Sequence, residues 1–201
     1  MKAILFIIVV LVTVCISCNE NDSNINKSKS AETLIITDSI KCQSYYENGN
    51  LRELGWKKRD KKTDWWFYLY PNGKLSKREK YDKSCKLSWQ MEYDSLGNSI
   101  FEGFFSGEKK NGYAKYYFPN GKMFKQGSYW NDELQGWWEE FNEKGEIIFE
   151  GSFEHSKKNG YFKYYYNNKP ESEGNYINNS KAGYWRYYDT TGVLKKVVEY
   201  D

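Results

Sequence analysis

This 201-residue chain has one histidine and four cysteines, which makes most catalytic arrangements hard to assemble. His155 is the single histidine, and Glu154 beside it would be its natural partner in a general base. No serine or cysteine nucleophile stands in a matching motif, so we interpret His155 as a solvated residue of a polar loop. Glu139 and Glu140 are adjacent, and neighbours on a strand point to opposite faces, which excludes a glycosidase pair. The sequence therefore predicts no catalytic residues and no enzyme.

The sequence also lacks a pattern of metal ligands or of cysteines that would indicate a metal site or a disulfide. One histidine and four scattered cysteines have no zinc-type spacing, so we expect no metal and no cofactor. Cys42 and Cys85 would persist in an exported chain, where disulfides form. The two are about three strands apart in the sheet derived below, or ~14 Å. Since a disulfide needs Cα atoms within about 7 Å, we expect two free thiols.

The first residues predict export. Lys2 precedes a dozen mostly apolar residues, and Cys15-Ile16-Ser17-Cys18 then meets a polar break. This stretch is short for a membrane span, which needs roughly 20 apolar residues. The four residues ending in Cys18 resemble a bacterial lipobox, although Cys15 stands where leucine is usual. The resemblance implies a signal peptide over 1–17, lipidation of Cys18, and a lipid-anchored chain in the bacterial cell envelope.

Residues 18–44 are predicted to form the lipidated cysteine and a flexible linker, because they are polar and small and lack aromatic rings. Acidic and amide residues directly after Cys18 favour the outer membrane or cell surface over the inner membrane. Two or more acyl chains would hold the chain there stably. The repeat domain is expected over 45–201.

Turn dipeptides recur along the chain with a nearly constant period. Their second residues are spaced 24, 24, 24, 24, 23 and 24 apart, and they are Gly49, Gly73, Gly97, Gly121, Gly145, Asn168 and Gly192. Asn-Gly between alternating segments favours a tight hairpin turn. The opposite connections, such as residues 106–111 and 155–159, are expected to be longer, Lys-rich loops. Each unit of about 24 residues is therefore a β-hairpin, and the units predict about fourteen strands from Lys41 to Tyr200.

Alternation within the strands predicts two unlike faces. The face predicted to be buried carries an aromatic residue in every unit, at Trp65, Trp89, Tyr113, Trp137, Tyr161 and Tyr184. The opposite face is less regular and is expected to be half solvated, with Trp66, Gln90, Ala114, Trp138, Phe162 and Trp185. A further glycine recurs six residues after most turns, which indicates an aromatic ring packed on bare backbone.

These elements predict an all-β fold, an elongated single-layer antiparallel β-meander of tandem hairpin repeats. A propeller blade needs four strands and ~40 residues, which this unit is too short to supply. A closed fourteen-stranded barrel stays open as an alternative.

The unit from Tyr117 to Tyr129, followed by Gly136-Trp137-Trp138-Glu139-Glu140-Phe141, resembles MORN repeats, and more closely their bacterial toxin-antitoxin-system antitoxin-repeat variant. The resemblance covers about Tyr45 to the end. It implies a single-layer β-meander and a toxin-neutralising or membrane-associated role.

A single-layer sheet leaves one face free for a partner. The candidate binding face consists of Trp66, Trp138, Phe162, Trp185, Tyr116, Tyr164 and Tyr187. We expect a non-enzymatic, lipid-anchored scaffold that binds an unidentified protein, with self-association through an aromatic face as one possibility. Carbohydrate or cell-wall-polymer binding through that face is the alternative. A formal charge of +3, from 30 basic and 27 acidic residues, does not favour nucleic acid. Lys109-Lys110 and Lys157-Lys158 are too few for a lipid-headgroup cluster.

Overall fold

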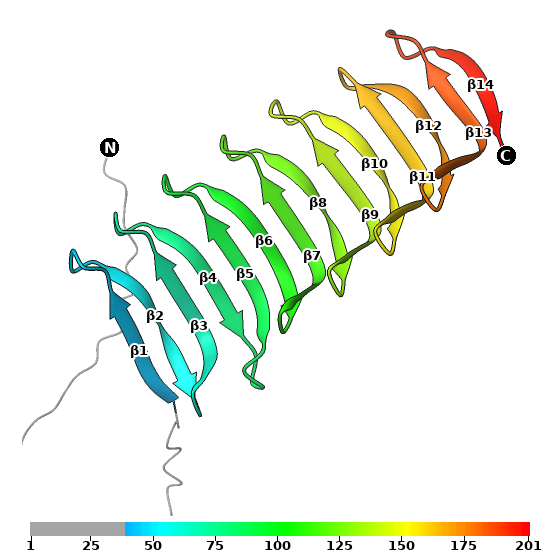
Figure 1. Cartoon of the computed structure of the whole chain (residues 1–201). Coiled ribbons are helices and arrows are strands. Elements are labelled where there is room, and N and C mark those ends of the chain that lie inside the picture. Colours follow the sequence, from blue (N-terminus) through cyan, green and yellow to red (C-terminus); the bar gives the residue numbers. More distant parts are fainter. Residues whose placement is uncertain (1–38) are drawn as a thin grey trace, which may run out of the picture. The chain divides into compact units, whose positions relative to one another are not determined.

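The computed structural model describes residues 39–201, which form one open antiparallel sheet of fourteen strands in sequence order (Figure 1). The strands are β1 (Ser39–Tyr45), β2 (Leu51–Lys58), β3 (Lys61–Leu69), β4 (Leu75–Tyr81), β5 (Leu87–Tyr93), β6 (Ser99–Ser106), β7 (Lys109–Tyr117), β8 (Met123–Trp130), β9 (Glu133–Phe141), β10 (Ile147–Glu154), β11 (Lys157–Tyr166), β12 (Lys169–Ile177), β13 (Ser180–Tyr188) and β14 (Leu194–Tyr200). The predicted β-meander is confirmed. Because β1 and β14 end the strand order, the barrel alternative is wrong.

The sheet begins earlier than the predicted domain boundary at residue 45. Strand β1 starts at Ser39 and pairs along its length with β2, from Ser39 opposite Lys58 to Ser44 opposite Glu53. The last residues of the predicted linker are therefore ordered as an edge strand. The predicted signal peptide and Cys18 lie outside the described residues. Within the described range, no helix is long and apolar enough to cross a membrane.

The two sets of turns differ from the prediction in length. The Asn-Gly side has the longer connections, such as residues 46–50, where Gly49 has φ +81° and the Asn48 side chain accepts a hydrogen bond from the Asn50 amide. The opposite side has mostly two-residue turns, such as His155-Ser156 with φ values of 49° and 63°. The exceptions are the longer connection 82–86 between β4 and β5 on this side and the two-residue turn Asn167-Asn168 on the Asn-Gly side. Paired positive φ values are typical of the type I′ turn, which suits strand twist. Lysines expected in loops therefore lie on strands.

Aromatic rings pack on the bare backbone of glycines, as the sequence predicted. A Cβ atom added to Gly127 would lie 2.2 Å from the nearest Trp138 ring atom, and one on Gly151 would lie 2.3 Å from the Phe162 ring. Gly127 and Trp138 are directly opposite each other on β8 and β9. Each ring therefore covers the glycine of the preceding strand, where any side chain would exclude it.

The assignment of the two faces was wrong. The face predicted to be half solvated is the packed one, and its large rings form the buried cluster of the sheet. We call it the packed face; its central row, from β3 to β13, is Trp66, Gln90, Ala114, Trp138, Phe162 and Trp185. The other side, which we call the open face, carries the row Trp65, Trp89, Tyr113, Trp137, Tyr161 and Tyr184. Glycine on the packed face removes the Cβ atoms, so rings can lie flat and close only there.

Candidate functional site

The large side chains proposed as an exposed binding face are the most buried in the sheet. Trp66, Trp138, Phe162 and Trp185 are only 0–3% exposed, so the prediction that they are available for stacking is wrong. Their ring edges are satisfied internally, since the indole nitrogen of Trp138 donates to the Ser128 carbonyl at 3.0 Å. On the same face, the side chains of Tyr116, Tyr164 and Tyr187 are only partly exposed.

Those three tyrosines lie beside the buried rings and form hydroxyl pairs. The pairs are Tyr116 with Tyr129 at 3.0 Å, Tyr164 with Tyr176 at 3.2 Å, and Tyr187 with Tyr200 at 2.7 Å. Burial, together with the hydrogen bond to Tyr164, raises the pKa of Tyr176 to about 12. The Tyr176 hydroxyl therefore stays neutral at physiological pH and acts as a hydrogen-bonding group.

The aromatic row that is exposed lies on the open face. Tyr113, Trp137, Tyr161 and Tyr184 are 37–61% exposed, and they stand on every second strand from β7 to β13. Strands are ~4.8 Å apart, so successive rings of this row are ~9.6 Å apart. This is the row that was predicted to be buried, so the expectation that it lies in the core is wrong.

Charged residues separate this row from a second, half-buried row of rings on the open face, which consists of Tyr117, Phe141, Tyr165 and Tyr188. Glu173 on β12 is the best-defined example. It accepts hydrogen bonds from Tyr161 at 2.8 Å and Tyr188 at 2.7 Å, and its carboxylate lies 3.8 Å from both Lys163 and Arg186. Burial alone would raise the pKa of Glu173, but these partners together hold it below the usual value. The open face is thus a banded surface of rings and paired charges.

Four lysines on the packed face each lie over several aromatic rings. They are Lys62, Lys110, Lys158 and Lys181, with ammonium-to-centroid distances of 4.2–6.0 Å. Lys158, for example, lies 5.3 Å from Phe162 and 5.1 Å from Tyr176, and donates to the Tyr164 hydroxyl at 2.7 Å. Cation–π contacts of this kind stabilise a desolvated ammonium. This role was not predicted from the sequence, where Lys110 and Lys158 were expected in loops.

The row of large rings on the packed face is interrupted at two successive repeats. Gln90 and Ala114 stand where Trp or Phe stands in the other repeats. Phe101 of β6 partly fills the gap, since its ring covers Gly103 and lies beside Ala114. A hollow of about 290 Å³ remains beside it.

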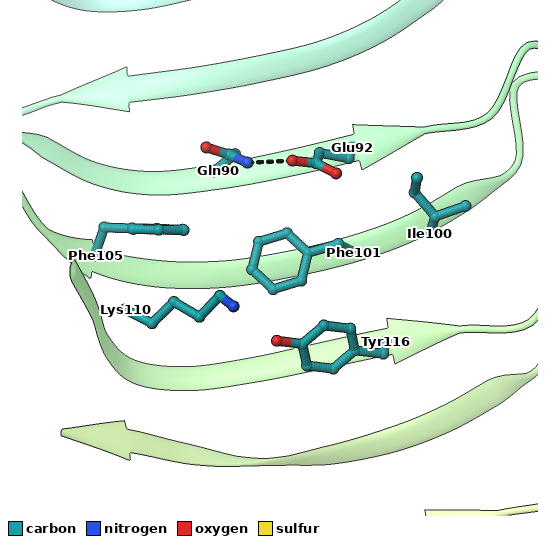
Figure 2. Close-up of a pocket in the computed structure, with 7 residues that line it drawn as sticks. All are labelled: Gln90, Glu92, Ile100, Phe101, Phe105, Lys110 and Tyr116. Atoms are coloured by element: carbon teal, nitrogen blue, oxygen red, sulfur yellow. Dashed lines mark hydrogen bonds between the residues drawn. The ribbon is translucent and has the colours of Figure 1, made fainter. Parts of the chain in front are cut away.

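The hollow has apolar walls and polar groups of both signs (Figure 2). Its lining residues are Gln90, Glu92, Ile100, Phe101, Phe105, Lys110 and Tyr116. The Phe101 ring lies 5.0 Å from that of Tyr116 and 6.1 Å from that of Phe105, centroid to centroid. Figure 2 shows this ring between Glu92 of β5 and Lys110 of β7, and Gln90 donates a hydrogen bond to Glu92. The arrangement can hold a small ligand but contains no nucleophile with a positioned base.

The remaining chemical candidates are isolated. His155 is exposed in its two-residue turn, as predicted, and its Nδ1 atom lies 2.6 Å from a Glu133 carboxylate oxygen. Cys42 lies on β1 and Cys85 in the connection between β4 and β5, and both are free thiols in the described part of the chain. Among residues 39–201, no group of three or more His, Cys, Asp or Glu side chains could hold a metal ion.

Comparison with known proteins supports the repeat assignment. The MORN repeat variant family model matches residues 40–55 and 110–131, so these two stretches are similar to MORN repeats. No curated protein matches it. Among 43 matching solved chains, the one titled "Crystal Structure of TarM" superposes with a TM-score of 0.31 at 13% identity. That match covers 47% of this chain and 19% of the TarM chain.

Proposed function

We propose that this MORN-like chain is a non-enzymatic scaffold of the bacterial cell envelope, anchored through a lipid on Cys18, that binds a protein partner with its open face. The observation that carries the binding proposal is the exposed row of Tyr113, Trp137, Tyr161 and Tyr184. Protein interfaces are enriched in aromatic residues, and buried Trp and Tyr anchors supply most of their binding free energy. The face differs from the one expected from sequence.

The charged residues between the rings of the open face favour a protein as the partner, in preference to a purely apolar surface. Lys163, Glu173 and Arg186 lie between the rings of the open face and are already paired with one another. Paired charges around aromatic anchors resemble the polar surroundings of a binding hot spot, which exclude water from it. Toxin neutralisation is the partner class that the sequence resemblance implies, and it remains part of this proposal.

A second candidate is binding of a carbohydrate or cell-wall polymer by the same row. The regular spacing favours it, because rings ~9.6 Å apart could stack on alternate sugars of a linear chain. The two candidates predict different ligands for one surface, so one set of variants separates them.

The test is a pull-down from native envelope extract with the purified chain and a Trp137→Ala/Tyr184→Ala double variant. Loss of two anchors should weaken binding of a captured protein by at least about 2 kcal/mol. The matched control is Trp130→Ala, which removes a ring that is 57% exposed at the end of β8, outside the row. Equal capture by the wild type and the double variant contradicts the proposed surface. Glycan-array binding that the double variant loses, without any protein partner, favours the second candidate.

The anchor is tested separately. Cys18→Ala should abolish labelling by a fatty-acid analogue and release the chain from membranes, because the acyl chains supply the attachment. Unchanged labelling and fractionation of Cys18→Ala would refute lipidation without affecting the binding proposal.

A further inference from the structure

We propose that the hollow between β5 and β7 is a binding site for an apolar amino acid, either free or as the last residue of a peptide. The shared chemistry is a carboxylate and an N–H donor on one carbon atom, which also carries an apolar side chain. This site lies on the packed face, so it is separate from the proposed protein-binding surface.

Lys110 supplies the group for the carboxylate. Four lysines of the packed face lie over several aromatic rings, as described above. Three of them donate a hydrogen bond to the tyrosine hydroxyl of their own repeat, namely Lys62 to Tyr68, Lys158 to Tyr164 and Lys181 to Tyr187. Lys110 is the exception among residues 39–201, because its ammonium is 6.0 Å from the Tyr116 ring centroid and makes no side-chain hydrogen bond there. In Figure 2 this ammonium points into the hollow toward Phe101. An ammonium in this position favours an anionic partner.

Glu92 supplies the opposite end of the site. Its Oε1 atom accepts the Gln90 hydrogen bond, and its Oε2 atom makes no hydrogen bond within the described part of the chain. Glu92 and Lys110 line the same hollow but form no ion pair with each other in the described sheet. A ligand N–H or ammonium can therefore bind Glu92 while its carboxylate binds Lys110.

Phe101, Phe105, Ile100 and Tyr116 form the apolar part of the lining beside these two groups. The volume of about 290 Å³ is close to the lower end of known ligand sites, which fits a single amino-acid residue better than a larger cofactor. The site exists because Gln90 and Ala114 replace large rings, a combination found in no other repeat within residues 39–201.

The experiment is isothermal titration calorimetry with three probes: L-phenylalanine, acetyl-Ala-Ala-Phe with a free carboxylate, and the same peptide as its C-terminal amide. We expect saturable binding of at least one carboxylate probe and about tenfold weaker binding of the amide, which lacks the charge. Binding of phenylalanine alone identifies a free amino acid as the ligand; binding of the peptide acid identifies a peptide end.

Two variants assign the site. Lys110→Met should weaken carboxylate binding about tenfold, since it removes a charged hydrogen bond but keeps the apolar stem. Lys158→Met is the matched control, because it removes a lysine that also lies over aromatic rings but does not line the hollow. It should leave the affinity for the carboxylate probes unchanged. Thermal unfolding of both variants reports whether each is folded. Absence of saturable binding by either carboxylate probe, equal affinity for acid and amide, or equal loss in Lys158→Met overturns the proposal.

Discussion

Glu79 shows how one residue can replace the glycine on which the other repeats depend. It stands in the glycine row of the packed face, opposite Trp66, and is only 4% exposed. Tyr68 and Tyr81 donate hydrogen bonds to its Oε2 atom at 2.8 and 2.9 Å, and the Lys77 ammonium lies 2.6 Å from Oε1. A buried carboxylate is tolerated only when it is paired in this way. This repeat therefore closes its packed face by polar contacts where the others use a ring on glycine.

Stability at low pH should depend on Glu79. Burial raises its pKa, but the hydrogen bonds from Lys77, Tyr68 and Tyr81 outweigh burial and lower the pKa below the usual 4.5. The unfolded chain therefore binds protons first as pH falls, and the stabilising contribution is lost between the unfolded and folded pKa values. We expect Glu79→Gln to lower the free energy of unfolding at pH 7 by about 2 kcal/mol. In urea titrations, the difference in the free energy of unfolding between wild type and Glu79→Gln should become smaller below pH 4.5.

Glu140 provides a control, because its expected effect on the pH dependence of stability has the opposite sign. Burial raises its pKa, against the lowering effect of Lys125 and Lys158. The folded state therefore takes up a proton more readily there, so wild type should gain stability relative to Glu140→Gln as pH falls. A gap for Glu79→Gln that stays constant between pH 7 and pH 3 would contradict the assignment.

At the scale of the element, the two-residue turns carry backbone strain that sequence changes can relieve. Arg59 and Asp60 join β2 to β3 with φ values of 49° and 59°. The left-handed region costs a residue with a Cβ atom roughly 1 kcal/mol, and Asn-Gly suits a type I′ turn best. Arg59→Asn/Asp60→Gly should therefore raise the free energy of unfolding by about 1 kcal/mol. Lys61→Asn, at the first residue of β3, should bring no gain; an equal gain there would refute strain relief at the turn.

Strand number, repeat period and sheet order could be predicted from sequence because each depends on local alternation and on turns such as Asn120-Gly121. The packed face could not be chosen by alternation alone, since both faces carry aromatic rows. The deciding signal was the glycine row: once Gly127 is paired with Trp138, the ring on bare backbone must belong to the buried side. The hollow depends on where Phe101 turns its ring beside Ala114, which repeat periodicity does not specify.

At the scale of the whole sheet, each strand pairs only with its sequence neighbours, from β1 to β14. Stability in such an array is approximately a sum over units and their nearest-neighbour interfaces. Packing follows the same rule, because the Trp138 ring covers a glycine on the adjacent strand and the Phe162 ring does the same one repeat later. Removing one complete unit should therefore leave the remaining units able to pair.

We expect the chain to fold after deletion of residues 122–145, which removes one 24-residue period containing β8 and β9 and joins Gly121 to Glu146. Strand β7 would then pair with β10, placing Ala114 opposite Gly151 as it now lies opposite Gly127. The urea m-value should fall by about one seventh, in proportion to the lost strands. Deletion of residues 122–133 is the matched control. It removes β8 without the rest of its unit, so the strand after β7 carries Trp138 where β8 carries Gly127. The alternation of glycine strands and ring strands is then broken, and the chain should not fold cooperatively. Cooperative unfolding of both deletions, or of neither, would contradict a sheet built from interchangeable hairpin units.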